Sequence, residues 1–184
     1  LWYREIEEQG IAAIVVTASG CGTTLKDYGF MLRNDPRYAE RAARVSALAK
    51  DLTELLANAQ LPFAAEQQLS VAYHAACSLQ HGQKVVDVPV RLLKMAGFVV
   101  HTPAEAHLCC GSAGVYNILQ PELAGRLGDR KVANLRAVGG DVIASTNIGC
   151  ATQIGQRTQT PVLHLAELLD WASGGPCPES LSRR

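Results

Sequence analysis

The sequence predicts an α/β protein, in which largely parallel sheets are layered between flanking helices. Short apolar runs alternate along the chain with longer stretches whose apolar residues recur at helical spacing, and glycine or proline separates them. Consecutive parallel strands need a long crossover, usually a helix, so this alternation indicates a parallel sheet. The chain has 184 residues, of which 48% are hydrophobic, which is enough for a sizeable core and excludes disorder.

The first elements are expected within residues 1–60. The chain opens without Met in an amphipathic helix, from which we expect a piece of a longer protein. A strand, a Gly-Cys-Gly loop and a helix follow at 11–16, 20–22 and about 25–32. Asp35 and Pro36 then favour a helix start, because Asp caps a helix and Pro fits its first turn. The apolar stripe of that helix continues to Leu56.

A second series of elements is expected after Leu61-Pro62, and cysteine occurs in the loops that follow its first three strands. The series comprises strand 69–74, the Cys77 loop, helix 90–96, strand 98–101, the Cys109-Cys110-Gly111 loop, a helix from Pro121 to Gly139-Gly140, strand 141–145, the Cys150 loop, strand 161–164 and helix 165–172. Residues 173–184 are rich in Gly, Pro, Ser and charge, which predicts a flexible tail.

An internal repeat relates residues 10–23 to residues 139–152. Six residues of the first window are identical in the second: Gly10, Ile14, Thr17, Gly20, Cys21 and Thr23 correspond to Gly139, Ile143, Thr146, Gly149, Cys150 and Thr152. Both windows share the order helix, glycine, strand and Gly-Cys loop. The sequence therefore predicts that 1–60 is the C-terminal half of a first repeat and that 61–172 is a complete second repeat.

The composition excludes several classes of protein. Seventeen basic residues balance seventeen acidic ones without a long block of either sign, which argues against nucleic-acid binding. No uncharged apolar run reaches the roughly 20 residues of a membrane-spanning helix, and no secretory signal is visible. Six cysteines in such a chain favour metal or redox chemistry in a reducing compartment over a disulfide scaffold. We therefore expect a cytoplasmic location, including the inner face of the membrane.

Four cysteines are the candidate ligands. Cys77 is separated by 31 residues from Cys109-Cys110, and 39 residues then precede Cys150. All four come out at the carboxyl edge of a parallel sheet, where binding sites usually form. Helices begin soon after these loops, and their N-terminal dipoles favour the thiolate that binds metal. The adjacent pair reaches one centre only where the backbone departs from strand geometry.

Other readings of these residues stay open. A single cysteine can be a small buried hydrophobe, a strained Cys109-Cys110 disulfide is conceivable, and Cys177 is most simply a bystander. Three histidines near the cysteines could ligate a metal or donate to a cluster sulfur: His74, His81 and His107. For each of them we favour a core or loop histidine that the backbone satisfies.

The cysteine motifs resemble a known family. The strings are Tyr73-His-Ala-Ala-Cys-Ser-Leu-Gln-His-Gly82, His107-Leu-Cys-Cys-Gly-Ser-Ala-Gly114 and Asn147-Ile-Gly-Cys150. They are similar to the cysteine-rich CCG domain shared by the heterodisulfide reductases and the iron–sulfur subunit of glycolate oxidase, and most similar to the glycolate oxidase branch. The resemblance covers nearly the whole chain and implies two CCG repeats, the first of them truncated here.

The resemblance also implies a cofactor and its ligands. The family ends each repeat in Cys-x-x-Cys, whereas here Asn147 and Ala18 stand at the first of those two positions. The remaining four cysteines suffice for a cubane [4Fe–4S] cluster or for zinc: Cys77, Cys109, Cys110 and Cys150. Cys21 belongs either to the preceding repeat's site or to this one.

By resemblance, the chain is an electron carrier in an oxidoreductase and not the site of glycolate oxidation. Flavin-bearing partner subunits would oxidise glycolate to glyoxylate, and electrons would pass through this subunit to a quinone or similar acceptor. The alternatives are a structural zinc or assembly domain and heterodisulfide-reductase-like thiol chemistry at Cys109-Cys110. Lactate is an alternative substrate.

Overall fold

A computed structural model describes residues 1–63 and 69–182 of the chain. The elements follow in the order α1 (Trp2–Gln9), β1 (Ile14–Val16), α2 (Ser19–Met31), α3 (Ala39–Leu48), β2 (Ala49–Asp51), α4 (Leu52–Leu56), β3 (Ser70–His74), the π-helix η1 (Ser78–Gly82), α5 (Val88–Met95), β4 (Val99–His101), α6 (Tyr116–Leu119), α7 (Pro121–Ala137), β5 (Val142–Ser145), α8 (Ile148–Gly155), β6 (Val162–His164), α9 (Leu165–Ala172) and α10 (Glu179–Ser182). The expected alternation of strands and helices is confirmed, and part of the expected boundary between repeats, 64–68, lies outside the described residues.

The main sheet has four parallel strands in the order β4-β3-β5-β6. The chain leaves β3 for β4 on one side and returns to β5 on the other, so the strand order reverses at β3. Loops diverge at such a switch point and leave a crevice at the carboxyl ends of the strands. The sheet topology therefore favours a binding site between the segments that follow β3, β4 and β5.

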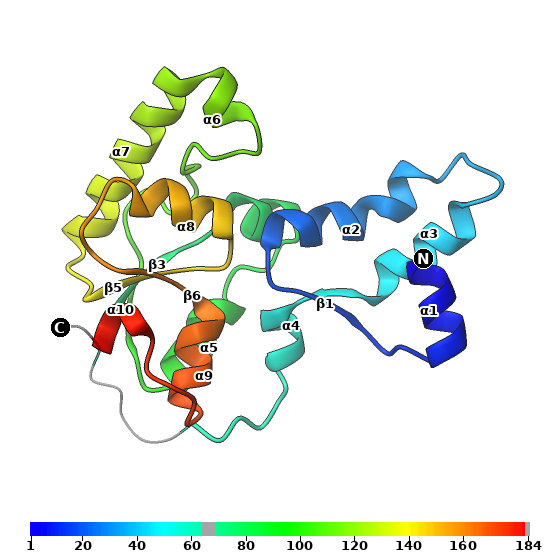
Figure 1. Cartoon of the computed structure of the whole chain (residues 1–184), viewed down its shortest axis with the longest axis horizontal. Coiled ribbons are helices and arrows are strands. Elements are labelled where there is room, and N and C mark those ends of the chain that lie inside the picture. The colour runs from blue at the N-terminus through cyan, green and yellow to red at the C-terminus, as the bar shows by residue number, and fades with distance from the viewer. Residues whose placement is uncertain (64–68, 183–184) are drawn as a thin grey trace.

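Helices cover both faces of this sheet, as Figure 1 shows: α7 and α8 lie on one face, and α5 and α9 on the other. Alternate residues of β3 supply the two cores, because successive side chains of a strand point to opposite faces. Val71 and Tyr73 belong to the core under α5 and α9, whereas Ala72 belongs to the core under α7 and α8. Cys110 and Cys150 also belong to this second core.

The N-terminal region has its own small core and a two-stranded parallel sheet, β1-β2, beside the main body (Figure 1). Its elements follow the order seen later in the chain. Gly10 ends α1 and Gly139 follows α7, both with positive φ (63° and 72°), and each is followed by a strand and a helix that carries cysteine. Glycine is the residue most often found in this left-handed conformation after a helix.

Three local expectations from the sequence are wrong. Cys21 and Cys150 lie within the first turn of α2 and α8 and not in loops. The helix expected from Asp35 to Leu56 is interrupted by β2, because residues 49–51 pair with β1. Asp51 then starts α4, where its carboxylate accepts a hydrogen bond from Thr53 N–H at 2.9 Å.

Two further features of the fold concern its C-terminal segment and the length of its helices. The segment 173–184 includes α10, and Leu181 packs against the core under α5 and α9. Within the described residues, no helix combines the length and the apolar character needed to cross a bilayer.

Candidate metal centre

Four of the predicted cysteines follow three adjacent strands of the main sheet. Cys77 follows β3, Cys109 and Cys110 lie between β4 and α6, and Cys150 lies in α8 directly after β5. All are free thiols. The ligand atoms of His74, Cys110 and Cys150 lie within 4.8 Å of one another, and these three residues are buried.

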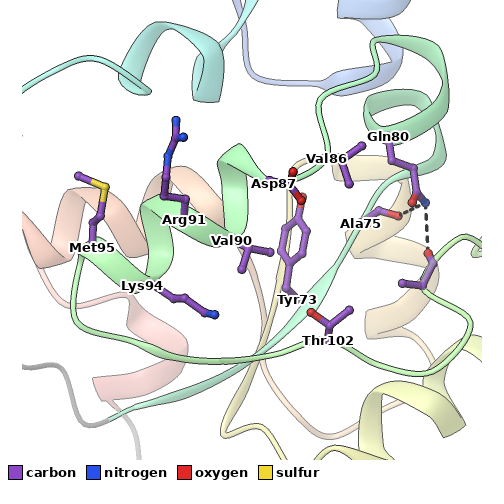
Figure 2. A pocket seen from close by; sticks show the side chains of 11 residues that line it. Tyr73, Ala75, Gln80, Val86, Asp87, Val90, Arg91, Lys94, Met95 and Thr102 are labelled. Atoms are coloured by element: carbon purple, nitrogen blue, oxygen red, sulfur yellow. Dashed lines mark hydrogen bonds between the residues drawn. The ribbon is translucent and has the colours of Figure 1, made fainter.

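The loops that carry Cys77 and the cysteine pair are tied together by Gln80 of η1. Its side-chain amide donates to the carbonyls of Ala75 and Ala106, each at 3.1 Å, and Figure 2 draws both bonds. Single-turn π-helical segments often occur at functional sites. Here the π-helix directs Gln80 across to the next loop and fixes Cys77 relative to the pair.

Gly111 lets the backbone turn sharply after the two cysteines. Its φ is +88°, and a Cβ there would lie 2.4 Å from the carbonyl oxygen of Ala124 in α7. Only glycine tolerates both conditions. The Gly111 N–H can therefore donate to Cys109 Sγ at 3.3 Å. The backbone of Cys109 and Cys110 departs from regular strand geometry here, which is the condition that the sequence set for both thiols to reach one centre.

Asn147 places Cys150 at the start of α8. Its side-chain oxygen accepts from Cys150 N–H at 3.2 Å as the N-cap of that helix. Its amide nitrogen donates to the buried Ser19 hydroxyl at 3.0 Å, and Ser19 in turn lies 2.7 Å from the Ser78 hydroxyl. Asn147 thus links the N-terminal region to the site.

The four thiols polarise one another. Hydrogen bonds from Cys110 and then Cys77 hold the pKa of Cys109 well below its usual range. A hydrogen bond from Cys110 lowers the pKa of Cys150 to about 5. The same bonds, with burial, raise the pKa of Cys77 and Cys110. Cys109 and Cys150 are thereby shifted toward the thiolate, the form that binds a metal cation.

His74 is the residue whose role the sequence underestimated. It ends β3, is 1% exposed and lies beside Cys150. Among the described residues no backbone group bonds to either ring nitrogen, and the neighbour within hydrogen-bonding reach is the Cys150 thiol, so the expectation of a histidine satisfied by the backbone is wrong here. Its position at the carboxyl end of a central strand was the one available signal.

Lys131 and Glu105 were missed because each resembles an ordinary surface charge in the sequence. Lys131 is fully buried in α7 and donates to the Glu105 and Ala106 carbonyls at 2.9 and 3.3 Å. Burial lowers its pKa, and the nearby cysteines oppose that shift. Glu105 accepts from Arg130 Nε and Asn134 Nδ2, each at 2.8 Å. Both residues fix the loop before Cys109.

The other candidates lie apart from this group. Cys21 is exposed and lines a separate pocket of about 440 Å³ beside β1. Cys177 is exposed and its thiol bonds to the Pro178 carbonyl at 3.7 Å. His81 lies 3.3 Å from the carbonyl of the exposed His107, so a protein group satisfies it as expected.

A pocket of about 620 Å³ adjoins the loops of the site on the α5 side of the sheet (Figure 2). Tyr73, Arg91 and Lys94 line it together with apolar side chains. Burial and then the charge of Asp51 raise the pKa of Tyr73, so its hydroxyl stays neutral.

Comparison with known proteins agrees with this geometry. A model of the cysteine-rich CCG domain matches residues 71–155, a range that contains His74 and all four clustered cysteines. The chain is also 30% identical to lactate utilization protein A of Bacillus licheniformis, over 91% of the chain and 74% of that protein. The chain belongs to the cysteine-rich CCG domain family.

Two further relatives of this CCG protein carry iron–sulfur names. It is 41% identical to the glycolate oxidase iron–sulfur subunit of Escherichia coli (strain K12) and 32% identical to the probable glycolate oxidase iron–sulfur subunit of Bacillus subtilis (strain 168). Each match covers 93% of the chain, but only 42% and 43% of those proteins. The chain therefore spans less than half the length of these two relatives.

Proposed function

We propose that this chain binds an iron–sulfur cluster, of the [4Fe–4S] type, and carries electrons within an oxidoreductase complex that oxidises glycolate. The observation that carries the proposal is the convergence of Cys77, Cys109, Cys110 and Cys150 at one edge of the sheet. The names of two relatives support the same cofactor.

The residues present fit such a cluster. Iron–sulfur clusters are bound by cysteine thiolates, and the protein tunes them through hydrogen bonds to sulfur, burial and nearby charge. Here Gly111 N–H donates to Cys109 Sγ, and the buried Lys131 places a positive charge near the thiolates. When bound, the cluster supplies one-electron transfer. The chain's own part is to hold it, exclude water and set its potential.

The proposal extends to the organisation of the chain and to its partners. Residues 1–60 would be the C-terminal half of one CCG repeat and 61–172 a complete second repeat, which the shared order of elements supports. Flavin-bearing subunits would oxidise glycolate and pass electrons through this subunit to a quinone or similar acceptor, in the cytoplasm or at the inner face of its membrane. Lactate is the alternative substrate, since one relative is named for lactate utilization.

The experiment is metal and sulfide analysis of the anaerobically purified chain, with EPR spectra before and after dithionite. We expect iron and sulfide near four each per chain, the content of a [4Fe–4S] cluster, and a signal that appears on reduction. Cys109→Ser and Cys150→Ser should lose the cluster. Cys177→Ser is the matched control and should load normally; normal loading of the first two variants contradicts the ligand assignment.

Substrate and partners need a second experiment. The tagged chain is recovered from its source cells with any bound subunits, and dye reduction is measured with glycolate and with lactate. We expect flavin in the recovered complex and faster reduction with glycolate. In complexes that carry Cys150→Ser, flavin reduction should persist while electron transfer to the dye stops.

Zinc is the second candidate, favoured by the buried group of one imidazole and two thiols. Zinc prefers such mixed nitrogen and sulfur ligands in structural sites. A colourless chain with about one zinc, the content of a closed structural site, would favour an assembly domain instead.

Thiol chemistry at Cys109 is the third candidate, because the lowered pKa of that half-buried cysteine favours a nucleophilic thiolate. Alkylation of a single thiol that abolishes disulfide reduction would identify this case.

A further inference from the structure

A buried histidine with no oxygen or nitrogen partner among the described residues faces the cysteine site. Both ring nitrogens of His74 are inaccessible to solvent, and the Cys150 thiol lies within hydrogen-bonding reach of the ring. A neutral imidazole carries one N–H donor and one nitrogen acceptor, and native structures rarely leave such groups buried and unpaired. The partners left for this ring are therefore the sulfur atoms of the site or a metal that those sulfur atoms would hold.

Three polar residues around the site already have other hydrogen-bond partners. Ser145, which pairs with His74 across β3 and β5, accepts from Asn147 N–H at 3.3 Å and lies 3.4 Å from the Asn147 carbonyl. The Asn147 side chain bonds to Cys150 N–H and to Ser19. Lys131 is bonded to two carbonyls of the preceding loop.

The ring instead lies among sulfur atoms. A His74 ring nitrogen and the Sγ atoms of Cys110 and Cys150 all lie within 4.8 Å of one another, on the face of the sheet that α7 and α8 cover. A single metal ion could bind all three atoms, whereas in a cubane each of them would bind a separate iron; imidazole and thiolate bind the same metals. The geometry therefore suits ligation better than chance proximity.

We propose that His74 is a nitrogen ligand of the iron–sulfur centre, beside Cys110 and Cys150. This inference rests on the cluster proposed above. A cubane cluster has four positions for protein ligands. If His74 takes one of them, only three of the four cysteines can bind iron. A neutral imidazole in place of an anionic thiolate makes the centre less negative and raises its reduction potential, as histidine does in other cluster types.

The test is pulsed EPR of the reduced chain, grown with ordinary or ¹⁵N-labelled histidine. We expect strong nitrogen hyperfine coupling that changes from the ¹⁴N to the ¹⁵N pattern in the labelled chain. His74→Cys supplies a thiolate at the same place. It should keep iron and sulfide, lose the nitrogen coupling and lower the midpoint potential. His81→Cys and His107→Cys are the matched controls and should keep the coupling.

Each failure has a distinct signature. A loaded wild-type chain with only the weak coupling of an imidazole that donates to sulfur overturns ligation by His74. Coupling that persists in His74→Cys also overturns it. A well-folded wild-type chain that takes up neither iron nor sulfide overturns the proposed function and this inference together. Far-UV circular dichroism of His74→Cys and a second variant, His74→Gln, separates loss of a ligand from loss of the fold.

Discussion

The two cysteine-bearing helices that follow β1 and β5 share a local plan but differ in their surroundings. Both begin directly after a parallel strand, and Cys21 and Cys150 lie in their first turns. Cys150 meets Cys110 and His74, because β5 pairs with β3 and the β3 and β4 loops close over it. Among the described residues, β1 pairs with β2 alone, and Cys21 is exposed. A helix that presents a cysteine therefore makes a site only where neighbouring strands supply more ligands.

The largest expected effect comes from blocking the turn that lets the β4 loop reach Cys150. Gly111→Ala places a methyl group 2.4 Å from the Ala124 carbonyl at a φ of +88°. We expect a loss of about 3–4 kcal/mol in the free energy of unfolding, and loss of metal binding. Urea denaturation and iron analysis measure both. Gly114→Ala, with φ +61° and open space, is the control and should cost about 1–2 kcal/mol; equal losses would contradict this account.

The second change removes the buried lysine beside the cysteine site. Lys131→Met removes one donor from each of the Glu105 and Ala106 carbonyls, which keep the Leu108 N–H and the Gln80 amide respectively. The loss of these two hydrogen bonds from a charged group should cost about 1–3 kcal/mol in unfolding free energy. The substitution also removes a positive charge near the cysteines, so the midpoint potential should fall by on the order of 50 mV, equivalent to about 1 kcal/mol. Redox titration measures the fall. Arg126→Met, an exposed change on the same helix, should leave the potential unchanged.

A third pair of changes exchanges the helix caps of the two regions. Asn147 caps α8 through its side chain, whereas Ala18, its counterpart before α2, makes no side-chain cap. Asn147→Ala should lower the free energy of unfolding by about 1 kcal/mol and weaken metal binding, because Cys150 loses its positioning bond. Ala18→Asn should raise the free energy of unfolding by a few tenths of a kcal/mol or more. Thermal denaturation of both variants checks the signs. Destabilisation by both changes would mean that the two helix starts are not equivalent.

The sequence predicts what depends on local pattern. The strands from β3 to β6, the helices between them and the convergence of four cysteines follow from periodicity and from the behaviour of parallel sheets. It does not predict β2, because residues 49–51 continue an apolar stripe at helical spacing and only pairing with β1 makes them a strand. The burial of Lys131 was not predicted for a related reason, because it depends on elements that are distant in the sequence. His74 was named as a possible ligand, but a histidine satisfied by the backbone was favoured, because its place beside Cys110 and Cys150 also depends on distant elements.

The smallest expected effect concerns acid stability of the loop before Cys109, which has no counterpart among the described residues of the N-terminal region. Hydrogen bonds from Arg130 and then Asn134 lower the pKa of Glu105 to about 2, whereas an unfolded glutamate titrates at about 4.3. A depressed carboxyl pKa stabilises the fold above the unfolded value, and this contribution is lost as the pH falls from about 4.3 toward 2. Glu105→Gln should therefore show a flatter fall in the urea midpoint of the metal-free chain over that range. Arg130→Met should flatten it similarly, and the double variant should add little, since both act on one interaction. An unchanged pH slope in Glu105→Gln would show that this carboxylate does not hold the loop.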